Sequence, residues 1–249
     1  MSGAGDDDSI TLSPAALAAL LEFRREKASK EEAAAHEDED TSTSLLMAED
    51  YGASQFWYSS ETSEFLAAEV RWCYEQVRKG HVVFLSSPSA YKAYRSMARL
   101  SSSGGGSGSA AASPPPPAAH LFEFDTRFAV FGSEFVHYDY NHPLQLPAHL
   151  LGACSVVMLD PPFLNHECLA AFAETVRALQ LPGGETRVLL ATGAVQLQSA
   201  AQLLGLRPTA KAILHAGGRL SNPFALYTNY EHQDTLGGWD EEAERAARQ

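Results

Sequence analysis

The stretch CSVVMLDPPFLNHE, residues 154–167, joins a run of strand formers to an acid, two prolines and an aromatic residue. The apolar run CSVVML is typical of a strand buried on both faces of a parallel sheet. In an open parallel sheet, ligands bind outside the carboxyl ends of the strands, and Asp-Pro-Pro-Phe stands at such an end. An isolated Asp-Pro-Pro-Phe is as readily an ordinary turn, but its position after a buried strand favours a functional site.

Further runs of strand formers lie on both sides of this stretch. They are HVVFL (81–85), HLFEFD (120–125), EFVHYD (134–139) and TRVLLATG (186–193). Near the C-terminus, AILHAG (212–217) and FALYTNYE (224–231) have no helix between them, which predicts an antiparallel pair at the edge of the sheet. With CSVVMLD (154–160), these runs make seven predicted strands.

Helical patterns separate most of these strands. Residues 60–80 have Ser60 as the expected cap and Gly80 as the expected stop. A second helix is expected to start at Pro88, with Ser87 as its cap, and a third covers residues 166–179. The alternation predicts an α/β fold, with a mostly parallel seven-strand sheet and helices on both faces.

Composition shifts mark the domain boundaries. Residues 1–45 are acidic and contain one helical pattern, so they are expected to form a partly helical extension. The folded domain is expected over 46–232, followed by a C-terminal tail over 233–249. Within the domain, residues 101–119 (SSSGGGSGSAAASPPPPAA) have almost nothing to bury and predict a flexible, dispensable insertion.

Charge and cysteine content narrow the function classes. The formal net charge is -13, of which -9 falls in residues 1–50 and -4 in residues 51–249. A protein that grips nucleic acid needs clustered Lys and Arg, and the sequence has no such cluster. Three cysteines without C-x-x-C spacing fit a reducing compartment: Cys73, Cys154 and Cys168. The sequence shows neither a signal peptide nor an apolar run of about 18 residues, and its histidines have no metal-site spacing. A soluble, cytoplasmic protein without a metal is therefore expected.

The predicted strand ends carry acids and hydroxyls. They are Ser86, Ser87, Glu123, Asp125, Asp139 and Asp160. An acid after the second strand can accept hydrogen bonds from both hydroxyls of a ribose, and an acid after the third can accept from an adenine amino group. The turn after the first strand offers backbone N–H groups at a helix start, where an anion binds well. Together they indicate an adenosine-containing ligand with an anionic tail.

The Asp-Pro-Pro-Phe sequence then fits a substrate amine. The Asp160 carboxylate and the Pro161 carbonyl could accept N–H bonds and so aim the nitrogen lone pair elsewhere. The fixed φ angles of Pro161 and Pro162 stiffen that arrangement, and Phe163 offers an aromatic face to a planar base or a cationic amine. The sequence therefore has the features of a loop that presents an amine for methylation.

Several motifs resemble one known family. SQFWYS (54–59), SSPSAY (86–91), FEFDTRFAVFGSEFVHYDYNHP (122–143), DPPF (160–163) and NPFALYTNY (222–230) are similar to those of the translation elongation factor 1-alpha lysine methyltransferases. That family has an older label as N6-adenine-specific DNA methyltransferases and belongs to the seven-strand, S-adenosylmethionine-dependent enzymes. The resemblance covers residues 46–232. One departure from the wider superfamily is Ser-Ser-Pro-Ser in place of the usual glycine-rich cofactor loop.

The resemblance implies roles for single residues. The set expected at the methionine end of the cofactor is Gln55, Phe56, Tyr58 and Ser59. The set expected in the cofactor loop is Ser86, Ser87 and Pro88. Asp125 stands at the ribose position and Asp139 near the adenine. The set expected at the acceptor amine is Asp160, Pro161, Pro162 and Phe163. Alternation along HLFEFD puts Glu123 and Asp125 on one face, so either acid could hold the ribose.

The resemblance implies an S-adenosylmethionine-dependent protein-lysine N-methyltransferase that acts on elongation factor 1-alpha. We also expect a monomer, and the lack of a long apolar run predicts no membrane contact. Two alternatives stay open. One is N6-adenine methylation of DNA or RNA, which the lack of a basic cluster disfavours. The other is a module that binds a cofactor or partner without catalysis, which the intact Asp-Pro-Pro-Phe disfavours.

Overall fold

A seven-stranded sheet in the order β3-β2-β1-β4-β5-β7-β6 forms the centre of the computed structural model. The structure describes residues 57–103, 117, 119–216 and 223–247. The strands are β1 (His81–Leu85), β2 (Ala119–Glu123), β3 (Phe135–His137), β4 (Cys154–Leu159), β5 (Arg187–Gly193), β6 (Arg207–Ala212) and β7 (Phe224–Thr228). The five strands from β3 to β5 run parallel, whereas β7 is antiparallel to both β5 and β6. The predicted sheet type is confirmed.

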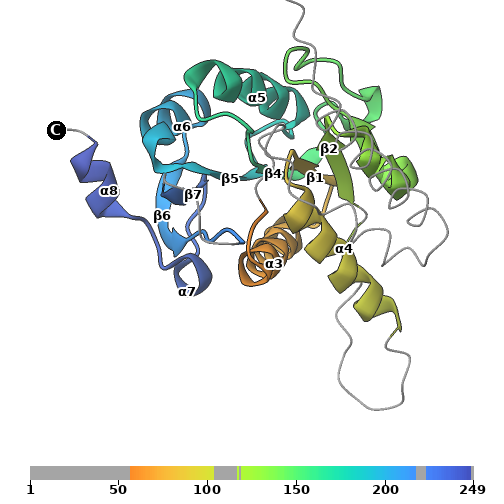
Figure 1. Ribbon diagram of the computed structural model, residues 1–249, viewed down its shortest axis with the longest axis horizontal. Coiled ribbons are helices and arrows are strands. Elements are labelled where there is room, and N and C mark those ends of the chain that lie inside the picture. Colours follow the sequence, from red (N-terminus) through yellow and green to blue (C-terminus); the bar gives the residue numbers. More distant parts are fainter. Residues whose placement is uncertain (1–56, 104–116, 118, 217–222, 248–249) are drawn as a thin grey trace, which may run out of the picture. The chain divides into compact units, whose positions relative to one another are not determined.

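Helices cover both faces of this sheet. The α-helices are α3 (Ser60–Val77), α4 (Pro88–Ser103), α5 (His166–Leu179), α6 (Leu197–Leu204), α7 (Gln233–Leu236) and α8 (Glu241–Ala246). Short 3-10 segments are η2 (Thr126–Glu134), η3 (Ala148–Leu150) and η4 (Ala194–Gln196). Figure 1 shows α3 and α4 on one side of the row of strands and α5 and α6 on the other. None of the helices in the described ranges is long and apolar enough to cross a membrane.

The core lies on both faces of the central strands. Every residue of β4 is buried, as its continuous apolar run predicts. On one face, Val157 and Leu159 belong to a cluster with Phe172 and Val176 of α5. All three cysteines are buried and unpaired. Burial of both faces explains why the central strands could be located from the sequence.

Two helix ends differ from the sequence prediction. The cap of α3 is Ser59 and not Ser60, because the Ser59 side chain accepts from the Thr62 amide at 3.2 Å. The helix ends at Val77, since Arg78 takes a left-handed conformation with φ of 53°. The two adjacent serines are chemically equivalent caps, so the sequence could not separate them.

The predicted antiparallel pair at the sheet edge is confirmed, but the bounds of its first strand, 212–217, were wrong. The edge strand is β6, which ends at Ala212 opposite Ala225. Since β7 begins only one residue earlier, at Phe224, the chain beyond Ala212 has almost no strand left to pair with. It turns away instead, and His215 pairs with Tyr58 in an isolated antiparallel bridge.

The predicted insertion is bounded by regular elements. Helix α4 continues to Ser103, and β2 begins at Ala119, so both ends of the predicted range 101–119 belong to the fold. Residues 104–116 and 118 lie outside the described residues, as does the predicted N-terminal extension over 1–45. The C-terminal tail contains α7 and α8. Helix α6, between β5 and β6, had no counterpart in the sequence prediction.

Candidate active site

Three neighbouring strands bring predicted site residues to one level at the sheet edge. Leu85 of β1 pairs with Phe122 of β2 and with Leu159 of β4. The next residue of each strand therefore stands at the carboxyl edge, namely Ser86, Glu123 and Asp160. The Ser86 amide donates to the Phe122 carbonyl at 2.7 Å, and the Asp160 amide donates to the Leu85 carbonyl at 3.1 Å. These backbone bonds fix the three positions side by side.

Ser86 makes the turn between β1 and α4. Its φ of 53° lies in the left-handed region, where a side chain costs roughly 1 kcal/mol. Pro88 then starts α4, as predicted. Ser87 is fully buried, and its hydroxyl donates to the Met158 carbonyl of β4 at 3.4 Å. The Ser87 side chain thus ties the loop to the sheet, while its carbonyl accepts from the Tyr91 amide at 3.1 Å.

Glu123 is a buried carboxyl group at the end of β2. Its Oε1 accepts from the Phe124 amide at 2.9 Å and from the Asp125 amide at 3.3 Å. Burial raises the pKa of Glu123 to about 7, although the two amide bonds oppose the shift. The second oxygen, Oε2, makes no hydrogen bond to any described residue. Glu123 can therefore offer one oxygen to a ligand at this edge.

Asp125 is engaged within its own loop. Its Oδ1 accepts from the Arg127 amide at 2.9 Å and caps η2, and its Oδ2 accepts from Arg127 Nε at 2.7 Å. The two acids that the sequence left open thus differ in their surroundings, because Asp125 holds Arg127 whereas Glu123 stands at the end of β2, and the assignment of the ribose to either acid stays a prediction. Asp139 follows β3, and its Oδ1 accepts from the amide and the side chain of Asn141 at 2.9 and 2.8 Å. It lies two strands away from β1.

Asp160 receives a hydrogen bond from Tyr58, 102 residues earlier in the chain, whose hydroxyl donates to Oδ2. Burial raises the pKa of Asp160 to about 8; the Tyr58 bond lowers it and the nearby Glu123 raises it. Pro161 is buried and Pro162 half-buried. Phe163 is 42% exposed, so its ring can contact a substrate. The predicted acceptor loop is thus assembled around a partly accessible carboxyl group.

In the segment before α3, some side chains support the fold and one contacts the predicted acceptor loop. Trp57 is buried, and its ring lies edge-on to Phe128 at 6.4 Å, which fits a packing role. Ser59 is the helix cap, so its side chain serves α3. Tyr58 reaches the acid of the acceptor loop, a contact that no spacing in the sequence could have revealed. Gln55 and Phe56 lie outside the described residues.

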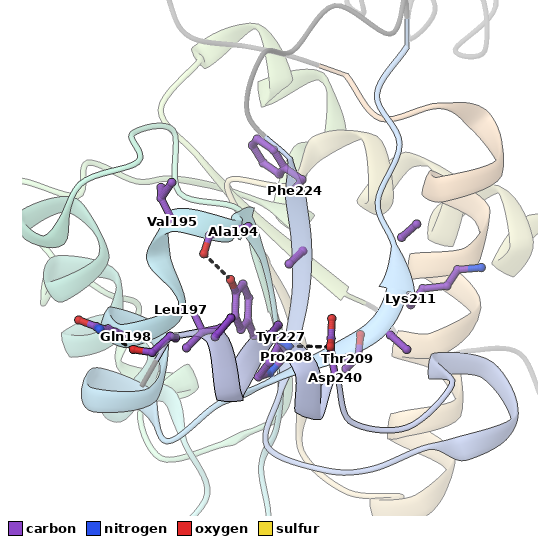
Figure 2. Close-up of a pocket in the computed structure, with 16 residues that line it drawn as sticks. Ala194, Val195, Leu197, Gln198, Pro208, Thr209, Lys211, Phe224, Tyr227 and Asp240 are labelled. Atoms are coloured by element: carbon purple, nitrogen blue, oxygen red, sulfur yellow. Dashed lines mark hydrogen bonds between the residues drawn. The ribbon is translucent and has the colours of Figure 1, made fainter. Parts of the chain in front are cut away.

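A cavity of about 600 Å³ lies elsewhere, between β6, β7, α6 and α8 (Figure 2). Across it, the Tyr227 hydroxyl donates to the Ala194 carbonyl at 3.3 Å. The Asp240 amide donates to the Pro208 carbonyl at 2.9 Å. None of the predicted site residues lines this cavity. The candidate active site is therefore the strand edge with Ser86, Glu123 and Asp160.

A mostly parallel seven-strand sheet with a reversed β7, carrying an acid on β2 and Asp-Pro-Pro-Phe after β4, defines a Rossmann-like methyltransferase. A family model described as "Probable N6-adenine methyltransferase" matches residues 49–232. The chain belongs to this family of methyltransferases.

Curated relatives agree with this assignment. The chain is 37% identical to EEF1A lysine methyltransferase 1 of Mus musculus over 93% of this chain and 97% of the relative. The Homo sapiens protein of the same name is 36% identical with the same coverage. Protein-lysine N-methyltransferase M142.8 of Caenorhabditis elegans is 36% identical over 90% of this chain and 96% of that protein.

Proposed function

We propose that this chain is an S-adenosylmethionine-dependent protein-lysine N-methyltransferase that acts on translation elongation factor 1-alpha. The observation that carries the proposal is the Asp160 carboxyl group, held by Tyr58 at the end of β4 beside the Ser86 turn. The names of the relatives supply the lysine and the elongation factor. We further propose a monomer in the cytoplasm, where buried free thiols such as these persist.

The residues at the strand edge fit the proposed cofactor. Glu123 has an oxygen without a hydrogen bond, and a carboxylate in this position suits the two hydroxyls of a ribose. The start of α4 after Pro88 suits the carboxylate of the methionine part. When bound, S-adenosylmethionine supplies an electrophilic methyl group on a positive sulfonium.

The acceptor loop orients the lysine, while desolvation favours its neutral form. A free lysine has a pKa near 10.4 and arrives protonated, so desolvation in the closed site must favour the neutral amine. In its ionised form, Asp160 accepts an N–H bond and so directs the lone pair; the Pro161 carbonyl can accept another. After transfer, the Asp160 carboxylate stabilises the positive charge on the methylated nitrogen.

Exposed apolar side chains around the site favour a protein substrate. Four of them follow the carboxyl ends of β2, β4, β5 and β6, and we call them the apolar rim: Phe124, Phe163, Val195 and Leu214. Val195 also lines the cavity of Figure 2. A contiguous apolar patch marks a protein-binding surface, so we propose that a protein substrate contacts these four side chains together. A nucleic-acid substrate would require cations there instead, and the nearby Arg127 is already paired with Asp125.

The test is methyl transfer from labelled S-adenosylmethionine to purified elongation factor 1-alpha or to plasmid DNA. Wild-type protein should label the elongation factor, and Asp160→Ala should abolish that label. Label on DNA would support the adenine reaction of the older family label. Label on neither substrate would contradict the proposed function.

A further inference from the structure

The Tyr58 hydroxyl lies on the acceptor side of the site. The family resemblance implies that Tyr58 lines the methionine end of the cofactor. In the structure, its hydroxyl donates to Oδ2 of Asp160, the acid expected to receive the substrate amine. Tyr58 is 4% exposed, so this bond lies away from bulk water. Burial is the main cause that raises the pKa of Tyr58 well above its usual value, and the charge of Asp160 is the second. The phenol therefore stays protonated and remains a hydrogen-bond donor.

The backbone around Tyr58 is fixed on both sides. The Ser59 amide donates to the Leu214 carbonyl at 2.9 Å, and the Ala216 amide donates to the Trp57 carbonyl at 2.8 Å. The Tyr58 ring also packs against the His215 ring with centroids 5.0 Å apart. The segment after β6 therefore holds Tyr58 in place, and the direction of its hydroxyl is set before any substrate arrives.

We propose that Tyr58 is a positioning residue for methyl transfer, whose hydrogen bond to Oδ2 fixes the Asp160 carboxylate and leaves Oδ1 for the substrate amine. This inference rests on the proposed function. Oδ1 makes no hydrogen bond within the described part of the chain, which agrees with a free acceptor position. A carboxylate that is held in one orientation loses less entropy when the amine binds.

The same bond favours the ionised form of Asp160. Burial, the largest cause, raises the pKa of Asp160 to about 8, and the Tyr58 hydrogen bond works against that shift. Without the hydroxyl, the pKa of Asp160 should rise further. A protonated Asp160 accepts N–H bonds poorly, so a larger fraction of the enzyme would be inactive near neutral pH.

The test compares wild type with Tyr58→Phe, which removes only the hydroxyl. We expect kcat to fall about ten-fold, the loss typical of one bond to a charged group. The acid limb of the pH-rate profile should move to higher pH, and the dissociation constant for S-adenosylmethionine should stay within about two-fold. A weaker cofactor affinity with unchanged kcat would overturn the proposal in favour of a cofactor-lining role.

Tyr230→Phe is the matched control. Tyr230 is also a buried tyrosine whose hydroxyl donates to a buried carboxylate, Glu69, at 3.0 Å. Its loss should lower stability and leave the acid limb in place. If both variants move the limb equally, the effect is structural and the proposal is wrong.

A readout without substrate separates this inference from the proposed function. Carbon-13 NMR of labelled aspartate carboxyl groups reports the pKa of Asp160 directly. A higher pKa in Tyr58→Phe supports the positioning role even if the wild type labels no elongation factor. An unchanged pKa overturns it even if the wild type is active on that substrate.

Discussion

Two carboxyl groups with raised pKa values, the buried Glu123 and the partly accessible Asp160, give the site a distinct pH response. Burial raises the pKa of Asp160 from 3.8 to about 8 and that of Glu123 from 4.5 to about 7. Between the ordinary pKa and the raised pKa of each group, the folded protein binds more protons than the unfolded chain. Their contribution to stability is therefore complete below about pH 4 and is lost as the pH rises through about 7 and 8. The site destabilises the fold in the form that we expect to be active.

Replacing Asp160 should show that the ionised carboxylate lowers stability while it supports activity. Asp160→Asn keeps an acceptor for Tyr58 and removes the buried charge, so at pH 8 the variant should be more stable than wild type by about 1 kcal/mol. At pH 4 the difference should be much smaller, because Asp160 is then protonated in the folded wild type and the pH is close to its unfolded pKa of 3.8. Thermal unfolding at both pH values measures this, alongside loss of methyl transfer. A variant less stable than wild type at pH 8 would contradict the prediction.

Two groups should shape the activity profile. Asp160 must be ionised, with a pKa of about 8, and a substrate lysine must be neutral, with a pKa near 10.4. A plot of log kcat/KM against pH should therefore have a slope near two below about 8 and near one from there to about 10. Initial rates across this range test the prediction. A profile that is flat between pH 6 and 9 would show that neither group limits the reaction.

At the scale of elements, the turn between β1 and α4 contains a serine, Ser86, in a conformation that glycine adopts more easily. Ser86 occupies a conformation that favours glycine, at the point where β1 passes into α4. The Ser87 hydroxyl and the β1–β4 backbone bonds hold this turn against the sheet. The predicted cofactor loop is thus shaped by packing and not by glycine content.

Ser86→Gly should relieve the strain. The left-handed conformation favours glycine, and the greater freedom of glycine in the unfolded chain offsets part of the gain. We expect a net stabilisation of about 0.5–1 kcal/mol. Ser86→Ala is the control, because it removes the hydroxyl and keeps the strain. Urea denaturation would measure both, and equal stability of the two variants would rule out backbone strain as the cause.

The sequence predicted the elements whose residues are buried with a clear period. Helix α5 has the predicted bounds, and the all-apolar β4 was located from its composition. The error at residues 212–217 arose because strand pairing depends on where the partner strand begins, which local composition does not encode. The position of Asp-Pro-Pro-Phe after β4 could be predicted from the sequence, and its role at the acceptor amine stays a prediction. The contact of Tyr58 with Asp160 could not be predicted, because it depends on the path of the chain after β6.

At the scale of the whole molecule, the apolar rim makes the two edges of the sheet different. Val195 follows β5 at the site edge and is 69% exposed. Leu151 is 49% exposed but precedes β4, at the opposite edge. Both are exposed aliphatic side chains, so they form a natural pair for testing which edge the substrate contacts.

Val195→Ser should weaken the binding of the protein substrate and leave the binding of the cofactor unchanged. Loss of one apolar contact of about 1 kcal/mol should raise KM for elongation factor 1-alpha about five-fold, with cofactor affinity unchanged. Leu151→Ser should leave KM as in wild type. Steady-state kinetics with the intact elongation factor measure both. An equal effect of the two substitutions would argue against docking at the rim.

The bond between Tyr58 and Asp160 determines how far the chain can be shortened from its N-terminal side before methyl transfer slows. All seven strands lie after residue 80, so a shortened chain that starts with α3 would retain the whole sheet, the Ser86 turn and the Asp-Pro-Pro-Phe loop. Such a chain would lack Tyr58 and the bridge that His215 makes to it. It would also lack the buried Trp57 and the Ser59 cap of α3, so we expect it to be less stable than the full chain and to transfer methyl groups slowly. A chain that keeps the whole sheet can therefore still lack a residue on which we expect methyl transfer to depend.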